Sequence, residues 1–325
     1  MVNGNMQLYN TERNVSQPLQ GHAGSFASIK IAGREDAQIL VFHEKKAEAP
    51  HEPPKLFIKE IGRDPSKGAP FGVQPTVIPV PADAAADFPV SLAISSKDEV
   101  AFLLTKMGYA YMFDCHTGKT MYRAKVTQDT VFVTCPQDST GAIFGITVRK
   151  GSVFRLQLNG QALVPYIVQT LRDTELALKV AGRLNLPGAE NLFAAEFERL
   201  ISTGQVAAAA KVVAASGNAL RTPATIARFQ QIPAEPNAVP PVLQYFSTLL
   251  ESGRLNEQES IEVAKPVLQQ GRLQLMEKWL KDDKLQCSEA LGDLIMPRDV
   301  GMALSVYLRA EVHGKAIQCL SLIHI

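Results

Sequence analysis

One short segment of the sequence contains the residue types of a phosphate-binding loop. Thr117-Gly118-Lys119-Thr120 matches the end of such a loop, in which backbone N–H groups and a lysine hold the phosphates of a nucleotide. The full motif requires another glycine five positions before Gly118, where this chain has Phe113. The residues on both sides are typical of strands, whereas the motif needs a strand followed by a helix. The sequence therefore predicts a hairpin turn here.

The other chemically active residue types are isolated from one another. The glycine-rich segment Gly21–Ser25 leads into a strand, which predicts a turn, and the pair Asp282-Asp283 is typical of a polar helix end. The six histidines are scattered, and none lies four residues from another histidine with a carboxylate in a metal-ligand pattern. We therefore predict no catalytic, cofactor-binding or metal-binding residues, no cofactor and no enzymatic activity. Peptide-binding residues are left unassigned.

Trp279 is the only tryptophan in the chain, and its environment has two interpretations. It lies on an apolar helical stripe with Leu275, Met276 and Leu280. Such a stripe is typical of a helix that packs into a core. The alternative is an exposed anchor for a partner, because tryptophan is enriched at the centres of protein interfaces. We expect the core position.

Composition and charge narrow the class of protein. The chain has 325 residues, enough for two domains, and a net charge of +1, which predicts neither nucleic-acid binding nor direct membrane binding. The apolar run Val206–Ala215 is too short to cross a bilayer. The opening residues lack the pattern of a signal peptide. The four cysteines are widely spaced, which favours reduced thiols in a cytosolic protein.

The first half of the sequence alternates between apolar and polar residues, as half-buried strands do. Four predicted strands with short turns between them form an antiparallel meander: Val90–Ser95, Val100–Thr105, Tyr109–Asp114 and Lys119–Lys125. Three more repeat this plan about 40 residues later: Val131–Cys135, Ala142–Val148 and Ser152–Leu158. Earlier strands are predicted at Met6–Tyr9, Ser25–Ile31, Gln38–His43 and Lys55–Ile61. Four strands per 40 residues indicate propeller blades, with a β-sandwich as the alternative.

Two proline-containing segments interrupt the predicted strands. Glu44–Pro54 is charged and is expected to be a surface loop. Arg63–Pro89 is expected to be a loop or an irregular sheet edge, because proline cannot donate a hydrogen bond to a neighbouring strand.

The apolar period changes to that of helices between Gln161 and Phe197. Pro165 is expected in the first turn of the first helix, and a break is expected near Asp173. There is no flexible linker, so we predict a rigid joint. Residues 1–162 are predicted to form the β part and residues 163–325 the α part.

The second half contains two internal echoes. Phe197-Glu-Arg-Leu-Ile-Ser-Thr-Gly204 corresponds to Phe246-Ser-Thr-Leu-Leu-Glu-Ser-Gly253, where each glycine is predicted to adopt a left-handed helix cap. Ala177-Leu178, Arg183 and Gly188 correspond in the same way to Ala303-Leu304, Arg309 and Gly314. Arg221–Pro223 and Ile232–Pro241 are predicted turns between helix pairs. Repeated helix–turn–helix units predict an α-solenoid.

Several runs in one register resemble the clathrin heavy chain over nearly the whole sequence. These runs include Met6–Tyr9, Val15–Pro18, Gly21–Ala23, Pro165–Ile167, Leu192–Ala194, Leu220–Pro223, Leu243–Phe246, Pro266–Arg272, Glu277–Lys281 and Ala303–Ala310. The resemblance implies a fragment: the later blades of an N-terminal propeller, followed by the helical linker and the start of the leg. The tail Leu320–Ile325 departs from the family pattern.

The resemblance also implies a function, which we state as an expectation. It is that of a structural component of the clathrin coat in vesicle-mediated intracellular transport and endocytosis. The implied partners are adaptor proteins with short linear peptides and, in the full-length protein, clathrin light chains and other heavy chains. The implied location is cytoplasmic, on coated pits and coated vesicles of the plasma membrane and trans-Golgi network, with membrane contact only through adaptors. The family's adaptor groove between the first two blades, and its trimerisation region, are expected outside this sequence.

Two alternatives from other classes remain. An enzyme with its active site at the centre of a propeller would need polar residues clustered at strand starts, where this chain has mostly Val, Phe and Ser. The other alternative is a propeller–solenoid scaffold of another vesicle coat or tethering complex, against which the long matching runs argue.

Overall fold

The computed structural model describes residues 4–12, 14–31, 37–44, 52–64, 66, 68–84, 87–233 and 239–323. Most of the predicted loop Glu44–Pro54 and the last two residues of the tail Leu320–Ile325 lie outside the described residues. The chain divides into two compact units, Met1–Val180 and Ala181–Ile325. The boundary predicted at residue 162, between the β part and the α part, remains a prediction.

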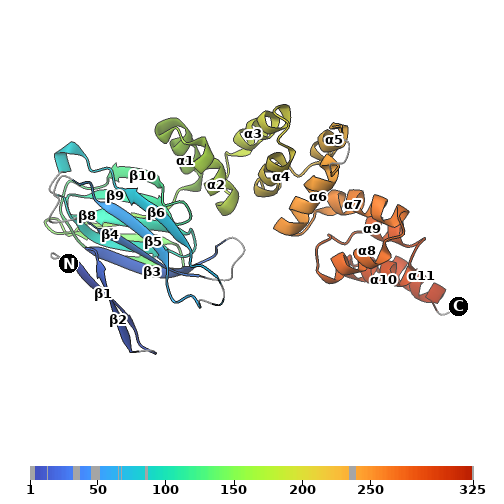
Figure 1. The fold of residues 1–325 in the computed structure, drawn as a ribbon, viewed down its shortest axis with the longest axis horizontal. Coiled ribbons are helices and arrows are strands. Elements are labelled where there is room, and N and C mark those ends of the chain that lie inside the picture. The colour runs from blue at the N-terminus through green and yellow to red at the C-terminus, as the bar shows by residue number, and fades with distance from the viewer. Residues whose placement is uncertain are drawn as a thin grey trace. The chain divides into compact units, whose positions relative to one another are not determined.

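The first unit is built from antiparallel sheets whose strands follow one another along the chain (Figure 1). A two-stranded ribbon pairs β1 (Asn5–Asn10) with β2 (Val15–Gln20). The first four-stranded sheet contains β3 (Ala23–Ile29), β4 (Ala37–Glu44), β5 (Lys55–Glu60) and β6 (Gly72–Val77). The second contains β7 (Pro89–Ser95), β8 (Val100–Thr105), β9 (Tyr109–Asp114) and β10 (Thr120–Lys125). The third contains β11 (Val131–Gln137), β12 (Ala142–Thr147) and β13 (Val153–Leu156).

The second sheet is buried on both faces. Every residue of its central strands β8 and β9 is buried. Leu103, Tyr111 and Phe113 join residues of the first sheet in one hydrophobic cluster, whereas the alternate residues Phe102 and Met112 lie outside that cluster. Because side chains of a strand alternate between faces, this sheet packs against neighbours on both sides. Stacking of successive meanders is the propeller-like arrangement that the 40-residue repeat predicts.

Two strands were not predicted from the sequence. β2 carries Pro18 and mostly polar residues, so it lacks the alternation that marks a half-buried strand, and its residues are largely exposed. β6 lies inside the proline-rich segment Arg63–Pro89, where it forms the edge of the first sheet and carries Pro75. An edge position tolerates proline because one side of the strand needs no partner. The alternative of an irregular edge is therefore the correct one for this segment.

Three helical pieces follow the last strand and belong mainly to the first unit. They are α1 (Gly160–Tyr166), the π-helix η3 (Ile167–Leu171) and α2 (Thr174–Leu184). The prediction that Pro165 lies in the first turn is wrong, because α1 begins at Gly160 with its cap at Asn159. The hydrogen-bond pattern widens to that of a π-helix soon after the proline, which is a known adaptation at helix irregularities. The predicted break near Asp173 is confirmed, since Arg172 has a left-handed backbone.

The second unit consists of short helices in packed pairs (Figure 1). The helices are α3 (Glu190–Ser202), α4 (Val206–Ala215), α5 (Pro223–Gln231), α6 (Pro241–Ser252), α7 (Glu257–Gln269), α8 (Leu273–Lys281), α9 (Glu289–Ile295), α10 (Val300–Arg309) and α11 (His313–Ile323). One continuous hydrophobic cluster runs from Phe197 to Cys319. Antiparallel sheets followed by helical repeats confirm the predicted fold class.

The two glycines of the first internal echo behave differently. Gly204 follows α3 with φ of 72°, the left-handed conformation that glycine adopts without strain. Gly253 follows α6 with φ of 165°, an extended conformation, so the predicted left-handed cap is wrong there. The chain leaves α6 extended toward Leu255, whose N–H bonds to the carbonyl oxygen of Lys284. Tertiary pairing has replaced the local cap.

The described helices include none with both the length and the apolar character needed to cross a membrane.

Candidate functional site

The segment that resembles a phosphate-binding loop is a hairpin turn, as predicted. It connects β9 to β10, and the carboxylate of Asp114 accepts hydrogen bonds from the Thr117 backbone N–H at 3.0 Å and from the Thr117 hydroxyl at 2.6 Å. Gly118 has φ of 72°. The Lys119 ammonium bonds to the Asp173 carboxylate at 2.6 Å. The lysine of the motif is thus paired with a carboxylate of the chain itself.

Among the residues that the structure describes, the others weighed from the sequence do not come together in a reactive group. Within the segment Gly21–Ser25 only Gly21 and His22 connect β2 to β3, and the other three residues already belong to β3, so the predicted turn is shorter than expected. His116 lies 2.8 Å from Glu99, and His22 contacts the rings of His43 and Phe88. Within the described ranges no group of three or more His, Cys, Asp or Glu residues could hold a metal ion.

The environment of Trp279 is intermediate between a core position and an exposed anchor. The side chain is partly buried and packs against the hydrophobic cluster of the second unit. It also lines a groove of about 660 Å³ together with Phe246, Leu250, Pro266 and Leu275. The same indole therefore contributes to the core and to an accessible surface.

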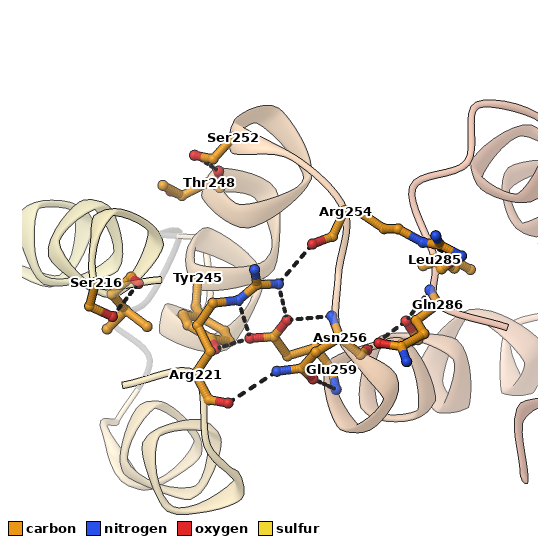
Figure 2. A network of polar contacts seen from close by, with 12 residues as sticks. Ser216, Arg221, Tyr245, Thr248, Ser252, Arg254, Asn256, Glu259, Leu285 and Gln286 are labelled. Atoms are coloured by element: carbon orange, nitrogen blue, oxygen red, sulfur yellow. Dashed lines mark hydrogen bonds and ion pairs between the residues drawn. The ribbon is translucent and has the colours of Figure 1, made fainter. Parts of the chain in front are cut away.

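The most extensive buried polar arrangement in the described part of the second unit is centred on Glu259 (Figure 2). Its carboxylate is fully buried and accepts hydrogen bonds from Arg221, from the Tyr245 hydroxyl at 3.0 Å and from the Asn256 backbone N–H at 2.9 Å. The Arg221 contact is bidentate, through Nε at 3.0 Å and through Nη2. Bidentate pairing is the geometry that best compensates a carboxylate for the loss of water.

The network joins three successive parts of the helical unit. Arg221 lies in the turn before α5, Tyr245 on α6, and Glu259 on α7, where it forms a reciprocal capping box with Asn256. Asn256 also donates from its side-chain amide to the carbonyl oxygen of Arg221 at 3.0 Å. The hydrogen bond to Glu259 raises the pKa of Arg221, and burial followed by the Glu259 charge raises the pKa of Tyr245. Both groups are therefore held in their protonated forms.

Arginine side chains also hydrogen-bond to backbone carbonyl groups at other helix ends of the second unit. Arg221 Nη2 donates to the carbonyl oxygen of Arg254 at 2.9 Å, and Arg254 Nε donates to that of Leu285 at 3.3 Å. Arg309 Nη1 donates to the carbonyl oxygen of Leu280 at 2.6 Å. Each of these carbonyl groups lies at or beyond a helix end, where intrahelical partners run out. The arrangement fixes one helix pair against the next.

The sequence reasoning missed this network. The spacing Asn256-x-x-Glu259 before an apolar run is the pattern of a capping box and could have located α7. No sequence signal pairs Arg221 with Glu259, because 38 residues separate them. The described residues of this network hold helix ends against one another, and Trp279 with its neighbours adds an accessible apolar groove.

This combination defines a class of protein, one with a propeller-like β region followed by a helical repeat scaffold. Comparison with known families agrees with that class. Residues 161–183 match the model described as clathrin, heavy-chain linker, and residues 185–249 match the model described as Clathrin-H-link.

Individual relatives match along almost the entire chain. A probable clathrin heavy chain 1 of Caenorhabditis elegans is 45% identical over 318 residues, covering 98% of this chain and 19% of the relative. The clathrin heavy chain of Drosophila melanogaster is 45% identical over 321 residues and that of Schizosaccharomyces pombe 41% over 322, with the same coverage. The chain spans about a fifth of the length of these relatives. The chain is therefore similar, over almost its whole length, to one segment of the clathrin heavy chains.

Proposed function

We propose that the chain is a scaffold segment of a clathrin coat that acts in vesicle-mediated intracellular protein transport and endocytosis. The observation that carries the proposal is the match to clathrin heavy chains at 38–45% identity over 97–98% of the chain. The match includes the sheets, the linker and the helical repeats in one order, so it concerns the whole arrangement and not a shared repeat type. The functional boundary in this proposal lies at residue 162.

The two parts have different tasks in the proposal. Residues 1–162 contribute blades that engage short adaptor peptides, and residues 163–325 contribute the linker and the start of the leg. Coat formation sums many weak contacts, so each leg must hold its shape while single contacts come and go. The buried ion pair Arg221–Glu259 and the arginine contacts to turn carbonyls support that requirement, because they fix neighbouring repeats to each other.

The proposed location is the cytoplasmic face of coated pits and coated vesicles, with adaptors as the link to the membrane. The proposed further partners are clathrin light chains and other heavy chains of the complete protein. A scaffold of another vesicle coat has the same architecture and is the alternative, but the relatives named above are all clathrin heavy chains.

A hybrid heavy chain tests the proposal directly. The segment of the Drosophila clathrin heavy chain that matches this chain would be replaced by residues 4–319, and the hybrid would be purified with its light chain. We expect closed cages at coat-forming pH and recovery of endocytic uptake in cells that lack their own heavy chain. A hybrid that trimerises and binds light chain but forms no cages would contradict the proposal. The matched control is the unmodified Drosophila protein prepared in parallel.

A further inference from the structure

The hairpin turn Asp114–Lys119 is more rigid than a surface turn needs to be. Asp114 is fully buried, and its carboxylate accepts hydrogen bonds from the backbone N–H and the hydroxyl of Thr117. Gly118 approaches β6 so closely that an added Cβ would lie 2.9 Å from side-chain atoms of Val73 and Thr76. The backbone that carries Lys119 is thus anchored both to its own sheet and to the first sheet.

This rigid turn presents Lys119 to the start of a helix. The Lys119 ammonium lies 2.6 Å from one carboxylate oxygen of Asp173, and the other oxygen accepts from the Leu176 N–H at 2.9 Å, which caps the first turn of α2. The bond to Asp173 raises the pKa of Lys119, so the amine is charged near neutral pH. Asp173 therefore binds two partners at once: the first turn of α2 and the lysine on the hairpin turn of the second sheet.

The helical segment before Asp173 packs outside the two large hydrophobic clusters of the described residues, and both α1 and η3 contact β10. Its buried residues Leu163, Val164 and Ile167 belong to neither of the two large hydrophobic clusters of the described residues. A cavity of about 370 Å³ lies between Leu163 of α1 and the second sheet, where Phe102 and Met112 form part of its wall. Incomplete packing of this kind forfeits dispersion contacts.

Only a few contacts close the rim of that cavity. The rings of Tyr122 and Tyr166 lie 5.0 Å apart, and the Tyr166 hydroxyl is 3.5 Å from the carbonyl oxygen of Arg123. The Lys119 and Asp173 side chains are 47% and 28% exposed, so salt can screen their attraction.

We propose that the turn Asp114–Lys119 is an ionic latch. It holds the segment α1–η3 and the first turn of α2 on the second sheet, and it releases them when the pair Lys119–Asp173 is screened or when Lys119 loses its charge. Release opens the segment over the cavity without unfolding the sheet, because the sheet's apolar faces do not depend on the pair. The proposal concerns the first unit alone and is independent of the coat function.

The test is hydrogen–deuterium exchange of the 325-residue chain at about 50 mM and about 500 mM NaCl, followed in peptides that cover residues 160–180. Exposed ion pairs are worth little, so the expected increase in exchange rate with salt is about two- to fivefold in the unmodified protein. Lys119→Met and Asp173→Asn should show the higher rate already at low salt and lose the salt response. Asp173→Asn retains one oxygen that can cap α2, so it removes the charge and the acceptor for Lys119 but keeps the cap.

Two controls separate the latch from general effects. Lys281→Met removes an exposed ion pair with Glu277 in the second unit and should leave the exchange of residues 160–180 unchanged. Lys119→Arg keeps the charge and should keep the salt response. Equal protection of residues 160–180 in Lys119→Met and the unmodified protein at low salt would overturn the proposal. So would a salt response that persists in Lys119→Met. If Lys119→Met exposes the whole β part, the proposal depends on Lys119→Arg and is wrong if that variant shows no salt response.

Discussion

Both units of the molecule bury apolar surface, but their buried carboxylates have different partners: Asp114 in the first unit holds a turn of its own sheet, whereas Glu259 in the second unit joins successive helices. Between the first and second sheets the contact consists of apolar and aromatic side chains such as Ile39, Leu103 and Phe113. In the helical unit an equally buried cluster surrounds the carboxylate of Glu259 and its arginine partner.

The difference follows from where each element satisfies its backbone. A strand inside a sheet pairs its N–H and C=O groups with neighbouring strands along its whole length, so the surface between sheets can be purely apolar. A short helix leaves up to four carbonyl groups and four N–H groups unpaired at its ends. The second unit has many such ends, and Arg221, Arg254 and Arg309 supply donors to them. The arginine hydrogen bonds to helix ends are therefore a consequence of the short helices.

The largest loss of stability is expected from a substitution that creates a cavity between the first and second sheets. Phe113 is fully buried in the second sheet and belongs to the cluster shared with the first. Phe113→Ala should lower the free energy of unfolding of the first unit by about 3–5 kcal/mol, the range for removing a large buried aromatic. Urea denaturation followed by circular dichroism at the strand signal measures it. Phe132→Ala is the control, because Phe132 is 71% exposed, and its effect should stay within about 0.5 kcal/mol.

The second effect tests the polar centre of the helical unit. Glu259→Gln removes a buried charge and leaves the Arg221 guanidinium, only 17% exposed, without its counter-ion. We expect a loss of about 3 kcal/mol, since breaking one side of a buried pair costs several kcal/mol. Trp279 is the only tryptophan and reports unfolding of this unit by fluorescence.

A paired substitution sharpens this prediction. Arg221→Met with Glu259→Met removes both charges, and it should recover at least half of the loss, because an apolar replacement avoids the cost of an unpaired charge. Lys281→Met is the surface control, since both members of its pair with Glu277 are more than half exposed. A double variant no more stable than Glu259→Gln would show that the network does more than balance charge.

The comparison also explains what the sequence could predict. The strands β7 to β10 were predicted within a residue or two because alternation and tight turns are local signals. β2 was missed because its exposed, polar residues show no alternation, and its pairing with β1 depends on register between segments. Gly253 was predicted as a cap from local sequence alone, whereas pairing of Leu255 with Lys284 determines its backbone.

The same limit applies to the candidate sites. The hairpin at Thr117–Thr120 followed from its flanking strands, but the pairing of Lys119 with Asp173 joins residues 54 positions apart. Nothing in the local pattern of either residue names the other. Pairings of this kind are set by tertiary packing and become visible only in the folded chain.

A third, smaller effect concerns Trp279. The side chain is only partly buried, so Trp279→Ala should cost about 2 kcal/mol, less than removal of a fully buried aromatic. Circular dichroism at the helix signal during urea denaturation gives the value, since this variant lacks the fluorescent probe. Leu243→Ala, which removes a 46% exposed side chain from the same groove, is the control and should have a smaller effect. A loss above about 4 kcal/mol would identify Trp279 as a core residue in the full sense.

The smallest expected effects concern the pH dependence of stability, because the two units lower the pKa of an aspartate in different ways. In the helical unit, hydrogen bonds from Lys315 and Tyr307 lower the pKa of Asp293, with distances of 2.5 Å and 2.7 Å. In the β unit, burial opposes ionisation of Asp129, but the backbone N–H groups of Lys150, Thr130 and Arg149 outweigh it and lower its pKa.

Both carboxylates give the same sign of pH dependence and different responses to salt. A lowered folded pKa stabilises the protein above the ordinary aspartate pKa near 4, and this contribution is lost as the pH falls through the lowered value. Asp293→Asn and Asp129→Asn should each flatten the loss of stability between about pH 5 and pH 3. At about 0.5 M NaCl the Asp293 contribution should shrink, because its main partner is a partly exposed ammonium that salt can screen. The Asp129 contribution depends on fixed backbone donors and should persist. Thermal melting across that pH range at low and high salt measures both, and equal salt sensitivity of the two variants would contradict the distinction drawn between the units.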